Sequence, residues 1–380
     1  MPRIYLDHNA TSPILPAVAD RMAEALRALI GNPSSVHREG QRARAAVEEA
    51  RRQVAVAVGT TFTQVVFTSG ATEANNLALH SLAAGLPAEL AVATTVVEHP
   101  SVLASVDALE RAGRRVVRLA VDGQGRLGPV DALVEHLLAE RVGALSVMLA
   151  NNEVGNLYAV AELAARLAPH GVKVHTDATQ AVGKVAVDVG ALGVELLSLS
   201  AHKCGGPKGV GALILAPGAT LQPLLRGGHQ ERGRRGGTEN VAGIVGAGLA
   251  LELAVPAGLA AAGRVRELVG RLQAGIEGAV PGAVAQGDPA QRLPNTLNVR
   301  FPDVDGETLL MNLDLDGISV SAGSACSAGS MEPSHVILAM GVPASAARGS
   351  VRFSLGVSTS VAEIEHVVAR LPSIVSRSRL

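Results

Sequence analysis

The chain has 380 residues, of which 48% are hydrophobic and 18% charged, a composition typical of a packed enzyme-sized protein rather than a disordered one. Its formal net charge of −1 excludes a whole-protein field that would attract nucleic acid or an anionic membrane. The two cysteines, Cys204 and Cys326, cannot form a disulfide framework, and no charged-then-apolar leader follows Met1. We therefore expect a cytoplasmic protein that does not contact a membrane.

Seven short strands, most of them separated by helical stretches, are predicted between residues 60 and 216. They are "VVFTS" at 65, "AVATTVV" at 91, "RVVRLA" at 115, "GALSVMLA" at 143, "VKVHTDA" at 172, "ELLSLSA" at 195 and "GALILA" at 211. Helical periodicity is clear in 100–112 and 159–168. This alternation predicts an α/β fold with a mostly parallel sheet flanked by helices, in which ligands bind at the carboxyl ends of the strands.

The pattern changes after residue 226. A glycine-rich stretch at 226–237 and a long helical region at about 240–279 precede two further strands, "LPNTLNVRF" and "VRFSLGV". The loop "SAGSACSAGSMEPS" lies between these strands. We expect a large domain at 14–255 and a smaller α+β domain that combines 1–13 with 256–380.

The first strand end with possible chemistry is "FTSGATEANN". The strand runs into a Gly-Ala-Thr turn, and Glu73 opens a helix, so Ala71 and Thr72 lie at a helix start where free amides bind phosphate. The alternative is an ordinary helix cap provided by Ser69 or Thr72.

The second strand end is "VVEHPSV". Pro100 suits the first position of a helix, which leaves His99 at or near the cap. The helix dipole there favours neutral imidazole, which can accept a proton or lie against an aromatic ring. A histidine that only caps the helix, or is merely exposed, is the alternative.

The third strand end is "VHTDATQ". Asp177 closes a buried strand, where a carboxylate is costly without a cationic partner, and Gln180 follows as a possible donor to a ring oxygen. A helix cap is the alternative interpretation of Asp177, and the sequence leaves both open.

The fourth strand end, "SLSAHKCGGPKG", presents Ser200, His202 and then Lys203 before a glycine-rich turn. A buried lysine requires a partner or loses its charge. Lys208 lies in the turn and is expected to be solvated. The Gly-Lys pair at 183–184 is followed by Val185, which excludes a Walker phosphate loop, and no HExxH or paired-cysteine spacing indicates a metal site.

A single ligand accounts for all four strand ends. It has a phosphate for the Gly-Ala-Thr turn, an aromatic ring for His99, a pyridinium nitrogen for Asp177 and an aldehyde for Lys203. Pyridoxal 5'-phosphate carries these groups, and a lysine with an acidic partner for the ring nitrogen is its usual protein signature.

The chain resembles the NifS/IscS-like cysteine desulfurases, fold-type I pyridoxal-phosphate enzymes related to aminotransferases. The resemblance covers nearly the whole chain and is carried, in family order, by "YLDHNATSP", "GNPSSVHREG", "FTSGATEANNLA", "EHPSV", "NNEVG", "HTDATQAVGK", "SAHKCGGPKGVGAL", "RGGTEN", "LPNTLNV", "SAGSACSAG" and "VRFSLG". It implies a seven-stranded large domain, a homodimer and conversion of L-cysteine to L-alanine. The sulfur would pass to an enzyme cysteine and then to an acceptor or scaffold protein.

The resemblance also implies residue roles. Lys203 would hold the cofactor covalently, Asp177 would keep its ring nitrogen protonated, and His99 would stack on the ring and relay protons. Gln180 would bond the phenolic oxygen. Asn151 and Arg352 would bind the substrate, with Arg352 on its carboxylate and Arg300 as the second candidate. The phosphate would be surrounded by Ala71, Thr72, Ser200 and His202, and by Thr238 from the other subunit.

The resemblance makes Cys326 the nucleophile that takes the sulfur as a persulfide. Small residues surround it in "SACSAG", so it is expected on a mobile, exposed loop, where it could also contact an iron–sulfur cluster transiently. Cys204 departs from the family pattern, which places a bulky residue beside the lysine. We interpret Cys204 as a small buried side chain, with a second redox-active thiol as the alternative.

Other functions remain open at this point. A selenocysteine lyase or an aminotransferase would use the same scaffold, and a platform without activity would only dock partners. The arginines at 226, 232, 234 and 235 would suggest an RNA-contacting patch, but without interleaved aromatic residues a loop at the subunit interface is favoured. The sulfur acceptor is not identified by the sequence.

Overall fold

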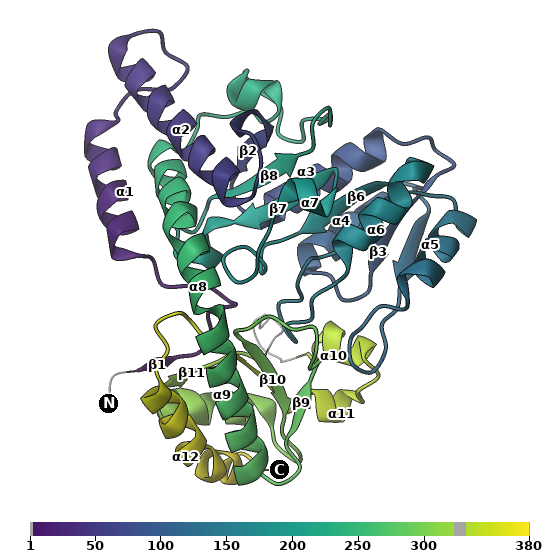
Figure 1. Ribbon diagram of the computed structural model, residues 1–380, viewed down its shortest axis with the longest axis vertical. Helices are drawn as coiled ribbons and strands as arrows, with labels where there is room; N and C mark the ends of the chain where they lie inside the picture. Colours follow the sequence, from purple (N-terminus) through teal and green to yellow (C-terminus); the bar gives the residue numbers. More distant parts are fainter. Residues whose placement is uncertain (1–2, 323–331, 380) are drawn as a thin grey trace.

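The computed structural model describes residues 3–322 and 332–379, so Cys326 lies outside the described residues. Figure 1 shows two parts, one built on a seven-stranded sheet and the other on a three-stranded sheet. A single long helix, α8 (Val241–Ala279), runs from one part to the other.

The seven-stranded sheet confirms all seven predicted strands. Its order is β2-β8-β7-β6-β5-β3-β4, and only β8 runs antiparallel to its neighbours. The strands are β2 (Val65–Thr68), β3 (Ala91–Thr95), β4 (Val116–Leu119), β5 (Val142–Ser146), β6 (Lys173–Asp177), β7 (Leu196–Ser200) and β8 (Gly211–Leu215). The sheet is therefore mostly parallel, as the alternation of strands and helices predicts.

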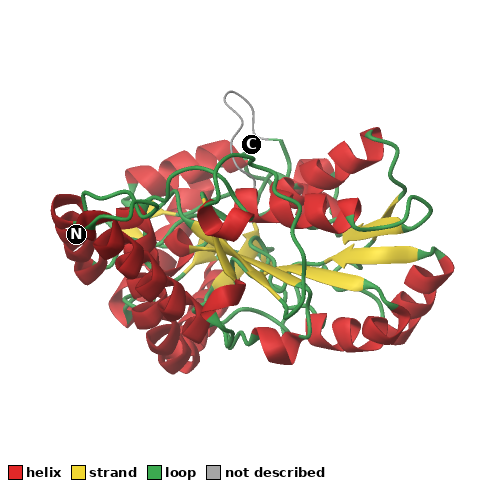
Figure 2. Cartoon of the chain, turned by 90° about the horizontal axis from the view of Figure 1, so that it is seen from above, coloured by secondary structure: helices red, strands yellow, loops and turns green. Residues whose placement is uncertain are grey.

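Helices cover both faces of this sheet (Figure 2), which explains why its strands read as continuous apolar runs. Val65 and Phe67 of β2 pack into the core beneath α2, whereas Val66 packs beneath α3. The helices of this part are α1 (Pro16–Ala28), α2 (Arg38–Ala57), α3 (Ala71–Ala84), α4 (Pro100–Arg111), α5 (Val130–Ala139), α6 (Val160–Leu167) and α7 (Val189–Leu192). Short 3-10 turns are η1 (Phe62–Gln64), η2 (Ala168–His170), η3 (Ala201–Cys204) and η4 (Gln230–Gly233).

The second part has a three-stranded antiparallel sheet in the order β12-β10-β9. Its strands are β9 (Val284–Gln286), β10 (Thr296–Arg300) and β12 (Ser350–Ser354), and its helices are α9 (Gly306–Leu315), α10 (His335–Ala339), α11 (Ala344–Ala347) and α12 (Val361–Arg377). The first residues of the chain join this part, because β1 (Ile4–Tyr5) pairs in parallel with β11 (Ile318–Ser319). The N-terminal segment then continues toward the large sheet.

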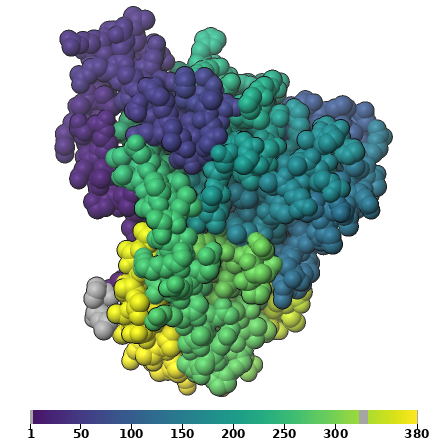
Figure 3. Space-filling view, viewed as in Figure 1, coloured from purple at the N-terminus to yellow at the C-terminus, as the bar shows by residue number. Residues whose placement is uncertain are grey.

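Helix α8 links the two parts through packing along its length. Its first half packs against α1 and α2 and its second half against α12, and Figure 3 shows its green surface extending from the N-terminal helices to the yellow C-terminal region. The domain boundary expected at 255/256 falls inside this helix, beside Pro256. By length and composition α8 is apolar enough to cross a membrane, but a core helix of a soluble protein has the same properties.

Candidate functional site

The carboxyl end of β6 carries a buried carboxylate. Asp177 is 6% exposed; Asn75 Nδ2 donates to its Oδ2 at 2.7 Å and the Thr179 amide donates to its Oδ1 at 2.9 Å. Asp177 therefore caps the following turn, as one interpretation predicts, and also contacts α3 through Asn75. Among the described residues no cationic side chain is paired with Asp177, so the carboxylate retains the capacity to bind a cationic ring nitrogen.

Lys203 lies in η3, directly after the neighbouring strand β7. Its Nζ donates to the carbonyl oxygens of Asn9 at 2.5 Å and Ala10 at 2.8 Å. Burial, with a contribution from the charge of Arg352, lowers the pKa of Lys203 to about 8. A larger fraction of this amine is therefore neutral near physiological pH than for an ordinary lysine.

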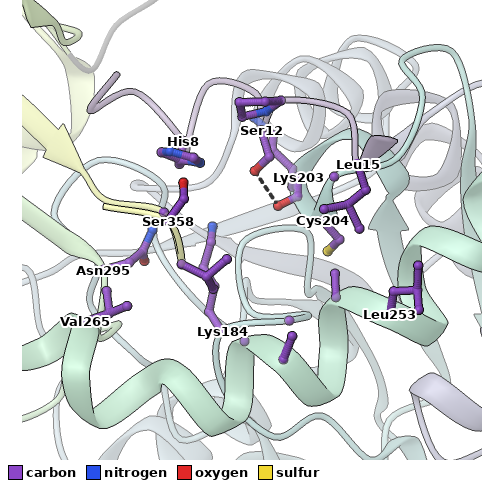
Figure 4. Close-up of a pocket in the computed structure, with 18 of the residues that line it drawn as sticks. His8, Ser12, Leu15, Lys184, Lys203, Cys204, Leu253, Val265, Asn295 and Ser358 are labelled. Atoms are coloured by element: carbon purple, nitrogen blue, oxygen red, sulfur yellow. Dashed lines mark hydrogen bonds between the residues drawn. The ribbon is translucent and has the colours of Figure 1, made fainter. Parts of the chain in front are cut away.

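A cavity of about 670 Å³ opens beside this lysine. Lys203 and Lys184 line it together with His8, and apolar residues of α8 such as Leu253 and Val265 form another part of its wall. Figure 4 shows these side chains on the wall of one cavity, with Ser12 donating to the carbonyl oxygen of Lys203. The amine thus lies where the N-terminal segment, η3 and α8 meet.

His99 is the N-cap of α4, as Pro100 predicts. Its Nδ1 accepts a hydrogen bond from the Ser101 amide at 3.1 Å, so the proton of the neutral ring resides on Nε2. Burial lowers the pKa of His99, which favours the neutral ring. The capping function is real, but it leaves Nε2 with no hydrogen-bond partner in the part of the chain that the structure describes.

The start of α3 has no side-chain cap. Gly70 is the N-cap residue, at φ 156°, and neither Ser69 nor Thr72 bonds the first turn as the alternative interpretation expects. A Cβ atom at Gly70 would meet nothing within 4 Å. The amides at the start of this 14-residue helix therefore face an open approach, which suits an anion such as phosphate.

The remaining residues expected around a phosphate lie in two places. Ser200 ends β7, and His202 follows in η3, where its Nδ1 contacts Thr11 Oγ1 at 3.1 Å. Burial, with the charge of Lys203, lowers the pKa of His202 to about 4. Thr238 is exposed and lines a smaller cavity of about 160 Å³ with Thr68 and Ser69 of its own chain.

A hydrogen-bonded network centred on Asn9 and Gln180 joins these elements. Gln180 Nε2 donates to the Asn9 carbonyl oxygen at 2.8 Å, the same oxygen that accepts from Lys203. Lys184 Nζ donates to Gln180 Oε1 and, at 3.1 Å, to Asn9 Oδ1. Asn9 and Lys184 could not be recognised as site residues from sequence, because their proximity depends on tertiary contacts.

Arg352 of β12 approaches the site from the smaller sheet. Its Nη2 donates to Asp7 Oδ1 at 2.8 Å and its Nη1 to the Asn152 carbonyl at 3.0 Å. Its Nε is buried without a hydrogen-bond partner among the described residues. Arg300 also has an Nε with no partner among the described residues, but of these two arginines only Arg352 contributes to the shifted pKa of Lys203.

Asn151 is buried, and its amide bonds within the protein. Its Nδ2 donates to the Val97 carbonyl at 3.0 Å, and its Oδ1 accepts from the amides of Glu153 and Val154. Asn151 therefore shapes the turn that presents the Asn152 carbonyl to Arg352.

Cys204 has the properties of a small buried side chain. It is 6% exposed, its Sγ donates to the Val182 carbonyl at 3.2 Å, and burial raises the pKa of its thiol to about 11. These observations favour the structural interpretation of Cys204 over a redox-active thiol.

Comparisons with known proteins agree with this site. The aminotransferase class-V model matches residues 4–367. A cysteine desulfurase of Enterobacter agglomerans is 45% identical over 380 residues, covering 100% of this chain and 94% of that protein. The cysteine desulfurase NifS of Azotobacter vinelandii is 44% identical over 383 residues, with the same coverage. A solved NifS-like protein superposes with a TM-score of 0.91 at 36% identity, covering 98% of this chain and 99% of that one. The chain therefore belongs to the aminotransferase class-V family, within its NifS/IscS-like cysteine desulfurases.

Proposed function

We propose that this desulfurase binds pyridoxal 5'-phosphate at the ends of β6 and β7 and uses it to convert L-cysteine to L-alanine. The observation that carries the proposal is the complementarity of unpaired groups. Asp177 is a buried carboxylate without a cation, and Lys203 is a partly buried amine without a carboxylate among the residues that the structure describes. A ligand with a basic ring nitrogen and an aldehyde supplies both missing partners.

The residues present fit this cofactor. The Lys203 amine would hold it, Asp177 would accept the ring N–H, and Gln180 would donate to the ring oxygen. The uncapped start of α3 at Ala71 and Thr72 would bind the phosphate, with Ser200 and His202 close by. When bound, the cofactor withdraws electrons from the substrate carbon next to the amino group.

Substrate binding is assigned to Arg352. The buried Nε has no partner among the described residues, and a carboxylate at that position would complete the guanidinium's hydrogen bonds. The Lys203 amine, when free and neutral, would take up the proton from the substrate carbon. His99, which holds its proton on Nε2, is suited to move a second proton.

Sulfur transfer is assigned to Cys326, which lies outside the described residues. Its thiolate forms a bond to the substrate sulfur while the substrate carbon–sulfur bond breaks. The electron pair of that bond stays with the carbon skeleton, which takes up a proton and leaves as L-alanine. The enzyme keeps the sulfur as a persulfide, so no external oxidant or reductant is needed.

The assembly and destination of the sulfur are further parts of the proposal. The exposure of Thr238 is consistent with its reaching the phosphate of a second subunit in a homodimer. The sulfur would pass to an iron–sulfur scaffold or a thiolation protein in the cytoplasm.

One experiment tests the covalent assignment. Borohydride reduction of the cofactor-loaded protein should add the mass of the cofactor to the peptide that contains Lys203. Lys208→Ala, which removes an exposed lysine of the same loop, should behave as wild type, whereas Lys203→Ala should lose both the label and the visible absorption band. A label that persists in Lys203→Ala would contradict the assignment.

Product analysis with L-cysteine separates the alternatives. With dithiothreitol present to reduce the persulfide, alanine and sulfide in equal amounts support a desulfurase, whereas an oxo acid would indicate an aminotransferase. Cys326→Ala should still bind cofactor and L-cysteine but release no sulfide. A comparison of kcat/KM for L-cysteine and L-selenocysteine distinguishes a selenocysteine lyase.

A further inference from the structure

Lys184 is a half-buried lysine that the mechanism above does not use. It follows β6 by seven residues and lines the same cavity as Lys203 (Figure 4). Its amine donates to two neutral oxygens, Oδ1 of Asn9 and Oε1 of Gln180. In the part of the chain that the structure describes, no carboxylate forms an ion pair with it, which is costly for a partly buried amine. The position therefore calls for a reason other than an ion pair.

The chemistry of a lysine amine decides which way the Gln180 amide points. A charged lysine can only donate hydrogen bonds, so the Gln180 atom that it contacts must be the carbonyl oxygen. The amide nitrogen then faces the opposite side, where it donates to the Asn9 carbonyl at 2.8 Å. A flipped amide would place a donor against the Lys184 amine and its oxygen against the Asn9 carbonyl.

The Asn9 carbonyl oxygen is a shared acceptor that brings the Gln180 amide nitrogen next to the Lys203 amine. The same oxygen accepts from Lys203 Nζ at 2.5 Å, so the amide nitrogen of Gln180 lies on the side of the Lys203 amine. An amide nitrogen carries two hydrogens, and only one is used by Asn9. The second remains for an acceptor held next to Lys203.

We propose that Lys184 is a positioning residue, which holds Gln180 Oε1 so that the amide nitrogen presents an N–H to the ring oxygen of the cofactor bound at Lys203. This inference rests on the proposed function. It assigns Lys184 no contact with the cofactor or the substrate, because its effect is transmitted through Gln180. Burial lowers the pKa of Lys184 to about 7, so the protonated amine, which can only donate hydrogen bonds, is the form that fixes the Gln180 amide.

The test compares Lys184→Met in the wild-type and Gln180→Ala backgrounds. Two readouts are independent of turnover: the Kd for pyridoxal 5'-phosphate and the pH midpoint of the visible absorption band. In the wild-type background, Lys184→Met should weaken binding on the order of tenfold, the usual effect of one lost charge-assisted hydrogen bond. The pH midpoint should move upward, because the ring oxygen loses a donor and the adjacent nitrogen then holds its proton more strongly.

The second background separates positioning from a simple charge effect. If Lys184 acts through Gln180, both changes should disappear when Lys184→Met is made in Gln180→Ala. If they persist there in full, Lys184 acts by its charge or by general packing, and the inference is wrong. Lys208→Met, which removes an exposed lysine, is the matched control and should leave both readouts unchanged.

A further variant guards against loss of folding. Lys184→Gln keeps an N–H donor and should give intermediate values, and near-ultraviolet circular dichroism reports whether each variant is folded. If the wild-type protein shows no visible band with pyridoxal 5'-phosphate, the proposed function fails. If the wild-type protein shows the band and Lys184→Met and Lys184→Gln both match it, only the role of Lys184 fails.

Discussion

Two regions of this protein differ in the partners of their cationic side chains: neutral oxygens in one and a carboxylate in the other. At the ends of β6 and β7, Lys184 and Lys203 bond only neutral oxygens among the described residues. Beside α2 and β2, Arg51 forms two hydrogen bonds to the carboxylate of Glu231, at 2.6 and 2.8 Å. Arg51 is 4% exposed and Glu231 is 6% exposed, so this pair is more shielded than the two lysines, which are half-buried on the wall of the cavity.

The Arg51–Glu231 pair has a structural role, whereas the lysines at the ends of β6 and β7 are available for chemistry. Glu231 also accepts from the Phe67 amide, and Arg51 donates to the Val65 carbonyl, so the pair fastens the 226–237 loop to β2. The loop needs this anchor because Glu231 and Arg232 adopt left-handed φ values of 47° and 59°, which are unfavourable for residues other than glycine. Paired charges stabilise the fold, whereas amines without a carboxylate remain available to react.

Three of the four arginines at 226–237 also bond groups of their own chain. Arg232 pairs with Glu48, Arg235 pairs with Glu73, and Arg234 donates to the Thr63 carbonyl. These contacts within the chain favour an anchored loop over an arginine patch that contacts RNA.

The first prediction concerns the stability that the Arg51–Glu231 pair gives to the fold. Glu231→Gln leaves the buried guanidinium of Arg51 with Glu48, at 3.1 Å, as its one carboxylate partner among the described residues, and should lower the free energy of unfolding by about 3 kcal/mol. Denaturant titration measures the loss. Glu49→Gln is the matched control, because it removes an exposed pair with Arg52 and should cost less than about 0.5 kcal/mol. Equal losses of unfolding free energy in the two variants would show that the buried pair stabilises the fold no more than an exposed pair does.

The second prediction concerns the reactivity of the Lys203 amine and its dependence on pH. The rate at which the cofactor-free protein captures pyridoxal 5'-phosphate should rise with pH and level off above about 8, since only the neutral Lys203 amine reacts. Burial and the charge of Arg352 lower this pKa, while Asp177, Asp7 and Cys204 oppose the shift. Stopped-flow absorbance measures the rate. A lysine derivative free in solution is the control, and a protein profile that still climbs near pH 10 would contradict the assignment.

The third prediction concerns the smallest effect. Cys204→Ser replaces a buried thiol next to Lys203 with a hydroxyl that can also donate to the Val182 carbonyl. Because the pKa of this thiol is raised to about 11, it is not a thiolate at neutral pH, and sulfide release should change by less than about twofold. A large loss of rate would make Cys204 part of the chemistry and would remove the distinction between packing and reactive groups in this region.

Much of the fold was predictable because buried strands are recognisable in the sequence as short apolar segments. The seven strands of the large sheet are short apolar runs, and Pro100 marks the start of α4. Strand β9 was missed because it has three residues and Val284 is 45% exposed. The long helical region predicted at about 240–279 is confirmed as α8, which continues through Pro256 although proline usually breaks a helix.

The site was predictable where a residue follows a strand, as Asp177 and Lys203 do. This was not possible for Asn9, Asp7 and Lys184, because their roles arise from hydrogen bonds between segments more than 170 residues apart. Examples are the bond from Lys184 to Asn9 Oδ1 and the bond from Gln180 to the Asn9 carbonyl. Asn75 was missed for a related reason, since only the packed structure joins it to Asp177 and Ser101.

The placement of the N-terminal segment has a consequence for biosynthesis. The Asn9 amide donates to Ser354 Oγ and the His8 amide to the Ser354 carbonyl, so this segment is secured by strand β12, whose Ser354 is synthesised 345 residues after Asn9. The wall around Lys203 can therefore close only after β12 has left the ribosome. The large sheet, whose strands all precede β12 in the chain, has time to form before that wall is complete.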